Sequence, residues 1–478
     1  MVSDARAPAA PDAYDWAPLG EIDYHGLRVP VVRRVDVLVV GGGTAGAVAA
    51  VAAGREGMRT LVAESLGFLG GTQTGAQVTP MMPNQIDGVP LNGGIDAEIN
   101  AAMMASGDSA RFSDGNEGWF NPEMLKVVLD DFVTGAGAEP LFFVQFVDVL
   151  MAGSAVAGAV FHGKRGLFAV EAARTIDATG DADVAVRAGA PFESGDETGE
   201  HQPLAFRFLL GGVDFGALMP FLETQGRFDA TPEARVGDVP LFTTAMVAGR
   251  NWPLEPLFRR ALADGVLVEE DLNYVQLFSM NGRPGELAFN NPRIREHIDG
   301  TNPFHLTHAA VEGRRMVRRY ADFFKRYVPG CAGSYVSATA PMVGVRETRR
   351  IVGEHVLTAA DVFAARKFDD AIARNCYPID LHRKDENAAR LLKLPPGEYH
   401  EIPYRSLVPL VVDNLLVVGR ALSASFEAQG AVRIQSNCRA MGEAAGRAMA
   451  RSIRQNVPPR ALDGVALRRH LVAHGGRL

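Results

Sequence analysis

The chain has 478 residues, which is enough for two or three domains and a large buried core. Its 47% hydrophobic and 22% charged content is typical of a globular protein, and the formal net charge of −8 disfavours a nucleic-acid surface or a basic membrane patch. The sequence has no apolar run long enough for a bilayer, no signal-peptide pattern and only three widely spaced cysteines, so we expect a cytoplasmic protein without disulfides or a metal site.

Residues 1–34 are expected to form an irregular arm, and the first regular element follows it. Residues 35–40 are apolar and mostly β-branched, which predicts a strand covered on both faces. Gly41, Gly43 and Gly46 then have G-x-G-x-x-G spacing, in which the first glycine permits a tight turn, the second lets backbone approach a pyrophosphate, and the third allows close packing of a helix on the strand. The N-terminus of that helix would present free N–H groups to the phosphates. The motif therefore predicts dinucleotide binding.

A second predicted strand, residues 59–64, ends in an acid about twenty residues after the glycines. Glu64 is expected to accept hydrogen bonds from the adenosine ribose hydroxyls, and the alternative is a nucleotide-free βαβ unit in which Glu64 caps a helix. Residues 67–75 form a second glycine-rich loop with the hydroxyls of Thr72 and Thr74. We expect this loop to pack on a flat ligand, and the alternative is a flexible surface loop.

Residues 95–104 and 122–132 are expected to be helices, the second with Pro122 in its first turn. A β-meander is indicated by alternating apolar segments separated by glycines, at residues 141–147, 155–161 and 166–170. The next strand, residues 173–180, ends in Thr179-Gly180 and returns the chain to the nucleotide site.

The pattern changes between about residues 200 and 400, where no second G-x-G-x-x-G occurs. Segments 206–210 and 340–345 are expected to be sheet, and residues 309–317 a helix. We interpret this region as an inserted substrate domain. The chain then returns with a predicted strand at residues 414–420 and a long helix rich in small residues at 434–453.

Four segments carry a resemblance to a known family: the Gly41–Gly46 motif, Gly70-Gly71-Thr72, residues 177–181, and the ending from Gly419-Arg420 to residues 442–446. In their order they resemble the bacterial FAD-dependent oxidoreductase family, whose FAD domain is similar to that of glutathione reductase and the fumarate reductase flavoproteins. Residues 344–350 and 377–382 resemble it too. The resemblance covers roughly residues 33–470 and names no substrate.

The patterns and the resemblance together predict an α/β fold class. We expect a Rossmann-like FAD-binding domain with a β-meander and an inserted α+β substrate domain. The expected boundaries are an N-terminal arm at 1–34, a discontinuous FAD-binding domain at 35–200 and 405–478, and the substrate or cap domain at 201–404.

The resemblance also implies where FAD would lie. The backbone at Phe146 and Val147 would meet adenine, Gly180 and Asp181 would lie along the phosphates or ribitol, and Arg420 would stand near the ribitol where related flavoproteins carry an aspartate. The helix beginning near Arg433 and Ile434 would point its N-terminus at the flavin N1 and O2 edge, where its dipole would stabilise anionic reduced flavin. With the glycine motif, the expected contacts of non-covalent FAD are Gly41, Gly43, Thr44, Ala45, Gly46, Glu64, Ser65, Gly70, Gly71, Thr72, Phe146, Val147, Thr179, Gly180, Asp181, Gly419, Arg420, Arg433 and Ile434.

Three residues are candidates for catalysis. Arg346 belongs to a charged group at residues 346–350 and could clamp a substrate anion, or the group could be a structural ion-pair network. His382 could act as a general acid or base, or be structural. Arg405 precedes the returning strand and could reach the flavin pocket. No metal motif is present in the sequence.

The leading hypothesis is an FAD-dependent oxidoreductase that transfers hydride between flavin and a small molecule at the interface of the FAD and cap domains. A flavin-dependent monooxygenase is the second, because residues 177–187 loosely resemble the Asp-Gly…Arg segment of aromatic hydroxylases, although the halogenase Trp-x-Trp signature is absent. A non-redox flavoprotein or an RNA-modification factor is the third, against which the acidic balance counts. The expected partner is a small-molecule substrate, with no nucleic acid and no membrane, and a homodimer stays open.

Overall fold

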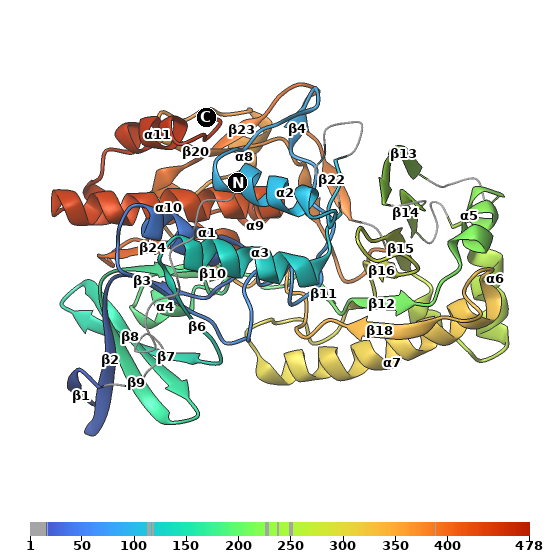
Figure 1. Ribbon diagram of the computed structural model, residues 1–478, viewed down its shortest axis with the longest axis horizontal. Helices are drawn as coiled ribbons and strands as arrows, with labels where there is room; N and C mark the ends of the chain where they lie inside the picture. The colour runs from blue at the N-terminus through green and yellow to red at the C-terminus, as the bar shows by residue number, and fades with distance from the viewer. Residues whose placement is uncertain are drawn as a thin grey trace.

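The computed structural model describes residue 16 and residues 18–111, 116, 119–224, 229–236, 239–247, 252–387 and 389–478. Figure 1 shows two bodies side by side along the long axis of the molecule. The larger body contains the beginning and the end of the chain, drawn blue to cyan and orange to red. The smaller body contains the middle of the chain, drawn green to yellow.

The larger body is built on an eight-stranded sheet of order β6-β3-β2-β9-β8-β7, with β1 added to β2 and β24 added to β9. Strands β6 (Glu139–Leu141), β3 (Thr60–Ala63), β2 (Leu27–Val40), β9 (Gly166–Asp177) and β24 (Leu415–Val417) are parallel. The meander is antiparallel, since β7 (Gln145–Ala152) pairs with β8 (Ala155–Gly163) and β8 pairs with β9. The predicted parallel sheet and β-meander are therefore both present.

Two strands are longer than predicted. Residues 20–34 are not irregular, because β1 (Gly20–Tyr24) and the first half of β2 form an antiparallel hairpin at the sheet edge. There Val29 and Val31 are buried against Ala169. β9 is one continuous strand that serves both the meander and the parallel sheet, where we expected two separate strands.

Helices α1 (Thr44–Arg55) and α10 (Gln435–Gln455) pack closely because of their small residues. A Cβ added to Gly442 would overlap the carbonyl oxygen of Ala45, and one added to Gly446 would overlap that of Ala49. The other helices of this body are α2 (Ile95–Ala105), α3 (Pro122–Gly135), α4 (Asp183–Arg187), α8 (Ala359–Phe363), α9 (Phe426–Val432) and α11 (Gly464–Ala473). Helices α2, α3 and α10 confirm the helices predicted at residues 95–104, 122–132 and 434–453.

In the residues that the structure describes, the smaller body is an antiparallel six-stranded sheet with three helices around it. The strands, in spatial order, are β13 (Asp229–Val236), β14 (Val239–Val247), β15 (Tyr274–Ser279), β16 (Leu287–Phe289), β12 (Phe208–Gly211) and β18 (Tyr335–Thr339). The helices are α5 (Phe215–Thr224), α6 (Glu255–Ala263) and α7 (Pro303–Tyr327). Phenylalanines 208, 258, 289, 323 and 324 lie at the centre of the core between sheet and helices.

One predicted strand of this body is wrong. Residues 340–345 form a loop with a single backbone bridge between Gly344 and Ala205, and the strand lies just before it, in β18. Pro341 cannot donate to a strand ladder, and Gly344 has no side chain to pack. The difference between the predicted strand and the observed loop is important because residues of this loop border the functional site.

The hydrophobic packing also differs from the predicted boundary at residue 404. The core of the smaller body includes residues from 204 to 345. Phe368, Ile379 and Leu407 instead share a core with α1 and α10. Residues 357–404 therefore pack with the larger body.

Short elements complete the structure. The paired strands are β4 (Gln85–Ile86) with β5 (Val89–Pro90), β10 (Phe192–Ser194) with β19 (Arg349–Ile351), β11 (Leu204–Ala205) with β17 (Arg293–Ile294), β20 (Ala371–Asn375) with β23 (His400–Pro403), and β21 (Ile379–Leu381) with β22 (Arg390–Leu392). Single 3₁₀ turns occur at Glu269–Asp271, Tyr404–Leu407, Gly419–Ala421 and Pro459–Ala461. Among the helices of the described ranges, none has the length and apolar character needed to cross a bilayer.

Candidate active site

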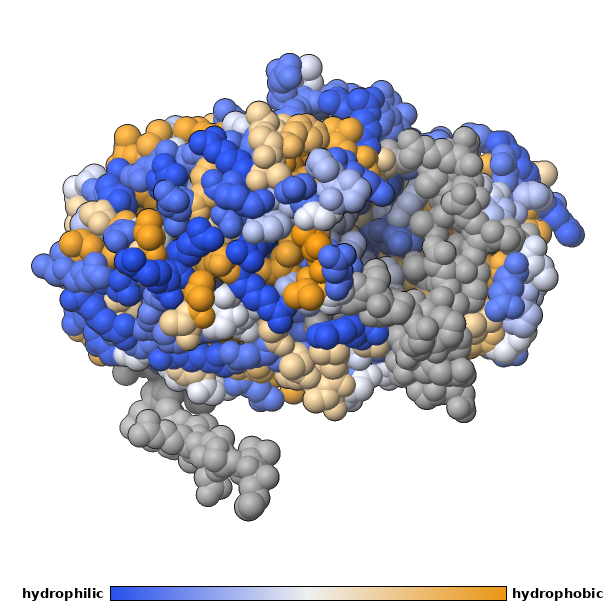
Figure 2. Space-filling view, turned by 90° about the horizontal axis from the view of Figure 1, so that it is seen from above, coloured by the Kyte–Doolittle hydropathy of each residue, from blue (hydrophilic) through white to orange (hydrophobic). Residues whose placement is uncertain are grey.

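A cavity of about 740 Å³ runs from the glycine turns of the larger body to the sheet of the smaller body. This volume is within the range of small-molecule and cofactor pockets. Figure 2 shows the surface hollowed between the two bodies, with hydrophilic residues inside the hollow. The residues predicted from sequence that line the cavity are Gly41, Gly43, Thr44, Ala45, Glu64, Ser65, Gly71, Thr72, Phe146, Thr179, Gly180, Asp181, Arg346, His382, Gly419, Arg420, Arg433 and Ile434.

Gly41, Gly43 and Gly46 differ in the reason why a side chain is excluded at each position. Gly41 has a φ of +96°, and a Cβ on it would lie 2.5 Å from the carbonyl oxygen of Ala178, while a Cβ on Gly46 would overlap the carbonyl oxygen of Gly41. A Cβ on Gly43 would come no closer than 3.8 Å to any protein atom outside its immediate neighbours. Protein packing therefore requires glycine at positions 41 and 46 but not at 43. The bare backbone of Gly43 faces the cavity, which fits the close approach of a diphosphate.

The beginning of α1 also fits an anionic ligand. Gly43 is the N-cap of this helix and has no side chain that could accept from the first N–H groups. Thr44 and Ala45 both line the cavity. Uncapped N–H groups and the positive end of the helix dipole at this point favour a phosphate.

Glu64 holds the first glycine turn. Its carboxylate is buried and accepts hydrogen bonds from the N–H of Gly42 (2.8 Å), the N–H of Leu66 (2.8 Å) and the hydroxyl of Ser65 (2.9 Å). No helix begins between Glu64 and α2, a stretch that is described throughout, so the helix-cap alternative is wrong. A carboxylate has about four acceptor positions, which leaves capacity for a ribose hydroxyl.

The second glycine loop packs on the first. The N–H of Gly70 donates to the carbonyl of Gly42 (2.9 Å), and a Cβ on Gly71, at a φ of +54°, would lie 2.8 Å from Cα of Gly43. Thr72 lines the cavity, whereas the hydroxyl of Thr74 is buried and donates to the carbonyl of Leu69 (2.6 Å). The loop is therefore anchored, and the expectation that Thr74 faces a ligand is wrong.

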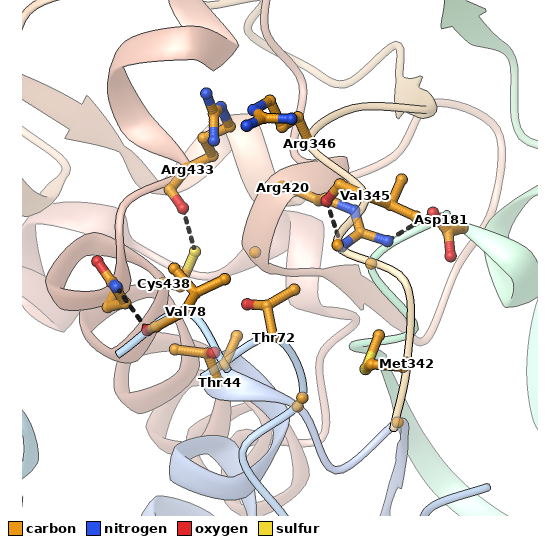
Figure 3. A pocket seen from close by; sticks show the side chains of 18 of the residues that line it. Thr44, Thr72, Val78, Asp181, Met342, Val345, Arg346, Arg420, Arg433 and Cys438 are labelled. Atoms are coloured by element: carbon orange, nitrogen blue, oxygen red, sulfur yellow. Dashed lines mark hydrogen bonds and ion pairs between the residues drawn. The ribbon is translucent and has the colours of Figure 1, made fainter. Parts of the chain in front are cut away.

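Arg420 lies against the turn that follows β9. Its Nη2 donates to the carboxylate of Asp181 (2.8 Å) and its Nη1 to the carbonyl of Val345 (3.1 Å), as the dashed lines of Figure 3 show. The hydroxyl of Thr348 donates to the same carboxylate (2.6 Å). A Cβ on Gly180 would lie 3.1 Å from the guanidinium carbon of Arg420. The arginine that departs from the wider flavoprotein pattern is thus paired with a neighbouring acid.

Four of the expected site residues do not line the cavity. Gly46 and Gly70 lie behind the turns that they shape, and Val147 follows Phe146 in β7. Arg405 is a correction, because Asp370 holds its guanidinium through two hydrogen bonds, of 2.9 and 3.2 Å, with the arginine side chain 49% exposed. The structure does not bring Arg405 to the flavin pocket.

The charged group at 346–350 divides into a structural ion-pair network and one arginine that faces the cavity. Glu347 and Arg350 are buried and paired with each other, and Glu347 also accepts from the N–H of Gly195 (2.9 Å) and contacts Nδ1 of His201 (2.9 Å). These residues form a structural network. Arg346 is separate from it, lines the cavity and donates through Nη1 to the carbonyl of Pro203.

Two further arginines were not predicted from the sequence. Arg207 and Arg293 are only 7% and 5% exposed and both line the cavity. Arg207 donates to the carbonyl of Gln77 (3.3 Å), and Arg293 donates to that of Asn387 (2.8 Å) and lies over the ring of Tyr274, 4.3 Å from its centre. Burial lowers the pKa of Arg207 to about 10 and also lowers that of Arg293.

A signal for both arginines existed in the sequence. Arg207 stands between two phenylalanines in an apolar segment, and Arg293 follows the Asn-Asn-Pro segment that ends at residue 292. A charged residue in a buried position needs a partner. The sequence does not show that Arg207 and Arg293 lie close together in the fold.

Asp380 and His382 form a pair at the same part of the cavity. Nε2 of His382 lies 3.3 Å from Oδ1 of Asp380, and Asp380 also lies 3.4 Å from Nη2 of Arg433. Burial, followed by the charge of Arg346, lowers the pKa of His382 to about 3. Burial would raise the pKa of Asp380, but His382, Arg433 and Arg346 hold it well below its usual range. At neutral pH the pair is therefore a carboxylate beside a neutral imidazole.

Outside the cavity, one group within the described ranges has a metal-like arrangement: Glu56, His470 and His474, with ligand atoms within 4.8 Å of one another. Glu56 already binds Arg447 (2.9 Å) and contacts Nε2 of His470 (2.7 Å). Hydrogen bonds from Arg454, His470 and Arg447 hold the pKa of Glu56 below its usual range, although burial alone would raise it. The absence of a metal in this protein stays a prediction.

Comparison with known proteins adds the family. The sequence profile described as "FAD dependent oxidoreductase" matches residues 36–471. The chain belongs to this family. The cofactor is therefore FAD, and the predicted oxidoreductase activity and FAD-binding α/β fold are confirmed. A search of curated protein sequences gave no match.

Several solved structures are similar to this flavoprotein. p-Nitrophenol 4-monooxygenase from Pseudomonas putida has 12% identity and a TM-score of 0.47, with 92% of this chain and 85% of that chain covered. A geranylgeranyl bacteriochlorophyll reductase-like protein from Thermoplasma acidophilum has 14% identity and a TM-score of 0.42, with 92% and 83% covered. The myxobacterial chondrochloren halogenase has 11% identity and a TM-score of 0.42, with 92% and 78% covered.

Proposed function

We propose that this oxidoreductase transfers hydride between FAD and a small molecule with an acidic group, bound where the cavity meets the smaller body. The observation that carries the proposal is the cavity itself. It joins the dinucleotide motif at Gly43 to Arg346 and His382, which lie on separate segments far along the chain. A pocket at the junction of two bodies is the usual place for a small ligand.

Different residues of the chain would bind the cofactor and the substrate. Gly43, Thr44 and Ala45 would hold the diphosphate of FAD, and Glu64 the ribose. Bound FAD supplies a two-electron acceptor or donor. Arg346 would bind the acidic group of the substrate, because a guanidinium can form two parallel hydrogen bonds with a carboxylate and a bound anion favours its charged form.

His382 would move the proton. Nε2 faces Asp380, so we assign its hydrogen to Nε2. His382 lines the cavity, and its Nδ1 is buried and has no hydrogen-bond partner among the residues that the structure describes. When the substrate is oxidised, the proton released from its O–H or N–H group would go to this nitrogen, and in the reverse direction it would return.

The test is anaerobic stopped-flow mixing of the purified holoenzyme with a panel of small organic acids and their amides, with flavin absorbance as the readout. We expect at least one acid to bleach the flavin and its amide to be far slower. Arg346→Ala should weaken the apparent affinity for that acid, while Arg405→Ala, the matched control, should not. Bleaching by amides as fast as by acids, or equal effects of the two variants, would contradict the proposal.

We further propose a cytoplasmic location, which the three free cysteines support.

A further inference from the structure

Four arginines meet at one end of the cavity: Arg207, Arg293, Arg346 and Arg433, referred to below as the arginine group. They act on one another electrostatically, since the charges of Arg293, Arg433 and Arg207 all contribute to lowering the pKa of Arg346, after burial itself. Figure 3 shows Arg346 and Arg433 at the same end of the cavity, away from Thr44 and Thr72. The arginine group is therefore separate from the site expected for the FAD diphosphate.

The charges of the arginine group are not balanced by the protein. Asp380 is the acid that lies near it, and His382 is neutral at physiological pH. Of the other acids lining the cavity, Asp181 and Asp183 are paired with Arg420 and Arg349, and Glu64 accepts hydrogen bonds from the first glycine turn and its own loop. Four arginines thus face one carboxylate, that of Asp380. Buried charges without partners are strongly destabilising, so the arginine group fits an anion from outside the chain.

The arginine group also has unused donors. Nε of Arg207, Arg293 and Arg433 is buried and without a hydrogen-bond partner within the described part of the chain. Each of these side chains is held in place through a different nitrogen, by the carbonyls of Gln77, Asn387 and Asp380 respectively. The guanidinium groups are therefore preorganised, with donors left for a ligand.

The arginines come from two sides. Arg293 lies in β17 of the smaller body, over the ring of Tyr274, and Arg207 lies in the short segment between β11 and β12. Arg433 is the C-cap of α9 in the larger body, and Arg346 lies in the loop between β18 and β19. A ligand with two separate acidic groups could engage both sides at once.

We propose that the substrate is an organic dianion with two separate acidic groups, one bound by Arg346 and Arg433 and the other by Arg207 and Arg293. The inference rests on the proposed function, because it concerns the molecule that exchanges hydride with FAD. It goes further by fixing the number of acidic groups. Reduced flavin can carry a negative charge as well, but it is a single charge and does not supply two separate acidic groups.

The test is isothermal titration calorimetry of the oxidised holoenzyme, which needs no turnover. The probes are the linear dicarboxylates malonate, succinate, glutarate and adipate and the phosphorylated acid 3-phosphoglycerate. Each dicarboxylate is matched to its monomethyl ester, and 3-phosphoglycerate to glycerate. We expect at least one dianion to bind about ten-fold or more tightly than its matched monoanion, as charge-assisted hydrogen bonds predict. Arg207→Gln should remove this preference and leave the binding of the monoanion within about three-fold, because Arg346 and Arg433 remain.

Arg405→Gln is the matched control, since it makes the same change at a solvent-exposed arginine outside the cavity. If Arg207→Gln does not retain FAD, Arg293→Gln tests the same side of the arginine group. The inference is overturned if every dianion binds no more tightly than its matched monoanion, or if the preference survives both substitutions. Flavin bleaching by a monoanion together with such a result would leave the proposed function standing, whereas absence of bleaching by any acid would contradict that function instead.

Discussion

The carboxylate of Asp380 lies 3.3 Å from Nε2 of His382, on the strand that ends just before the histidine. This contact orients the imidazole, and Nδ1 is left as an acceptor with no hydrogen-bond partner among the described residues. Burial, followed by the charges of the neighbouring arginines, lowers the pKa of the ring, so the imidazole is neutral at physiological pH. The first predictions concern this pair.

His382→Gln should slow flavin reduction by ~10²–10⁴-fold, the usual effect of losing a proton-transfer group, without changing FAD content. His162→Gln, on the exposed face of β8, is the control and should leave the rate unchanged. The measurement is the limiting rate of anaerobic reduction by the substrate found with the acid panel. A limiting rate equal to that of the wild type would remove His382 from the chemistry.

The pH dependence of the free energy of unfolding should also reveal the lowered pKa of His382. Its pKa is about 3 in the fold against an ordinary value of 6.5. Between these values the unfolded chain binds a proton that the folded chain does not, so this contribution to the free energy of unfolding is complete above about pH 6.5 and decreases as the pH falls. His382→Gln should therefore lose less stability than the wild type between pH 7 and pH 5. Urea denaturation at both pH values is the measurement, and equal losses would show that His382 is not held neutral.

Gly43→Ala should lower FAD affinity by at least about ten-fold, or ~1.4 kcal/mol, with little effect on folding. The added Cβ meets no protein atom closer than 3.8 Å, so it would occupy ligand space alone. Gly135→Ala, near the end of α3 where a Cβ meets nothing within 4 Å, is the matched control. Flavin absorbance per chain after gel filtration measures the outcome. Full occupancy in Gly43→Ala would mean that the diphosphate does not approach this residue.

Gly446→Ala should destabilise the fold by ~1–3 kcal/mol, as overpacking of a close interface does. Its Cβ would overlap the carbonyl oxygen of Ala49 in α1, so the two helices would have to move apart. The free energy of unfolding in urea is the measurement, again against Gly135→Ala. If both variants unfold alike, the close packing of α1 on α10 is not what stabilises this part of the larger body.

These sites differ in how far the sequence could predict them. The glycine turn, the acid of β3, the meander and α10 depend on neighbours within a few residues or on a repeating pattern, and all were predicted. Arg207, Arg293 and Arg346 are 86 and 53 residues apart in the sequence and meet only because the strands of the smaller body fold against the larger one. Local pattern carries no information about that meeting.

The predictions that were wrong also depend on contacts between segments that are distant in the sequence. Arg405 could not be placed because its partner, Asp370, comes from a segment 35 residues earlier. The arm at residues 20–34 joins the sheet because β2 continues toward the N-terminus beside β9, although Val29 and Val31 were a readable cue. The segment 357–404 packs on α1 and α10, and only the three-dimensional arrangement shows that its core is shared with the larger body.

The central claim is that FAD and an acidic substrate share one cavity, with the diphosphate at Gly43 and the substrate at the arginine group. A crystal structure of the purified yellow protein, soaked with the tightest-binding dianion, tests it most directly. The account predicts one FAD per chain, its diphosphate against the backbone of Gly43 and its flavin ring toward Ile434, with the dianion between Arg346 and Arg293. A diphosphate seated on the arginine group, or a dianion bound anywhere else, would contradict it.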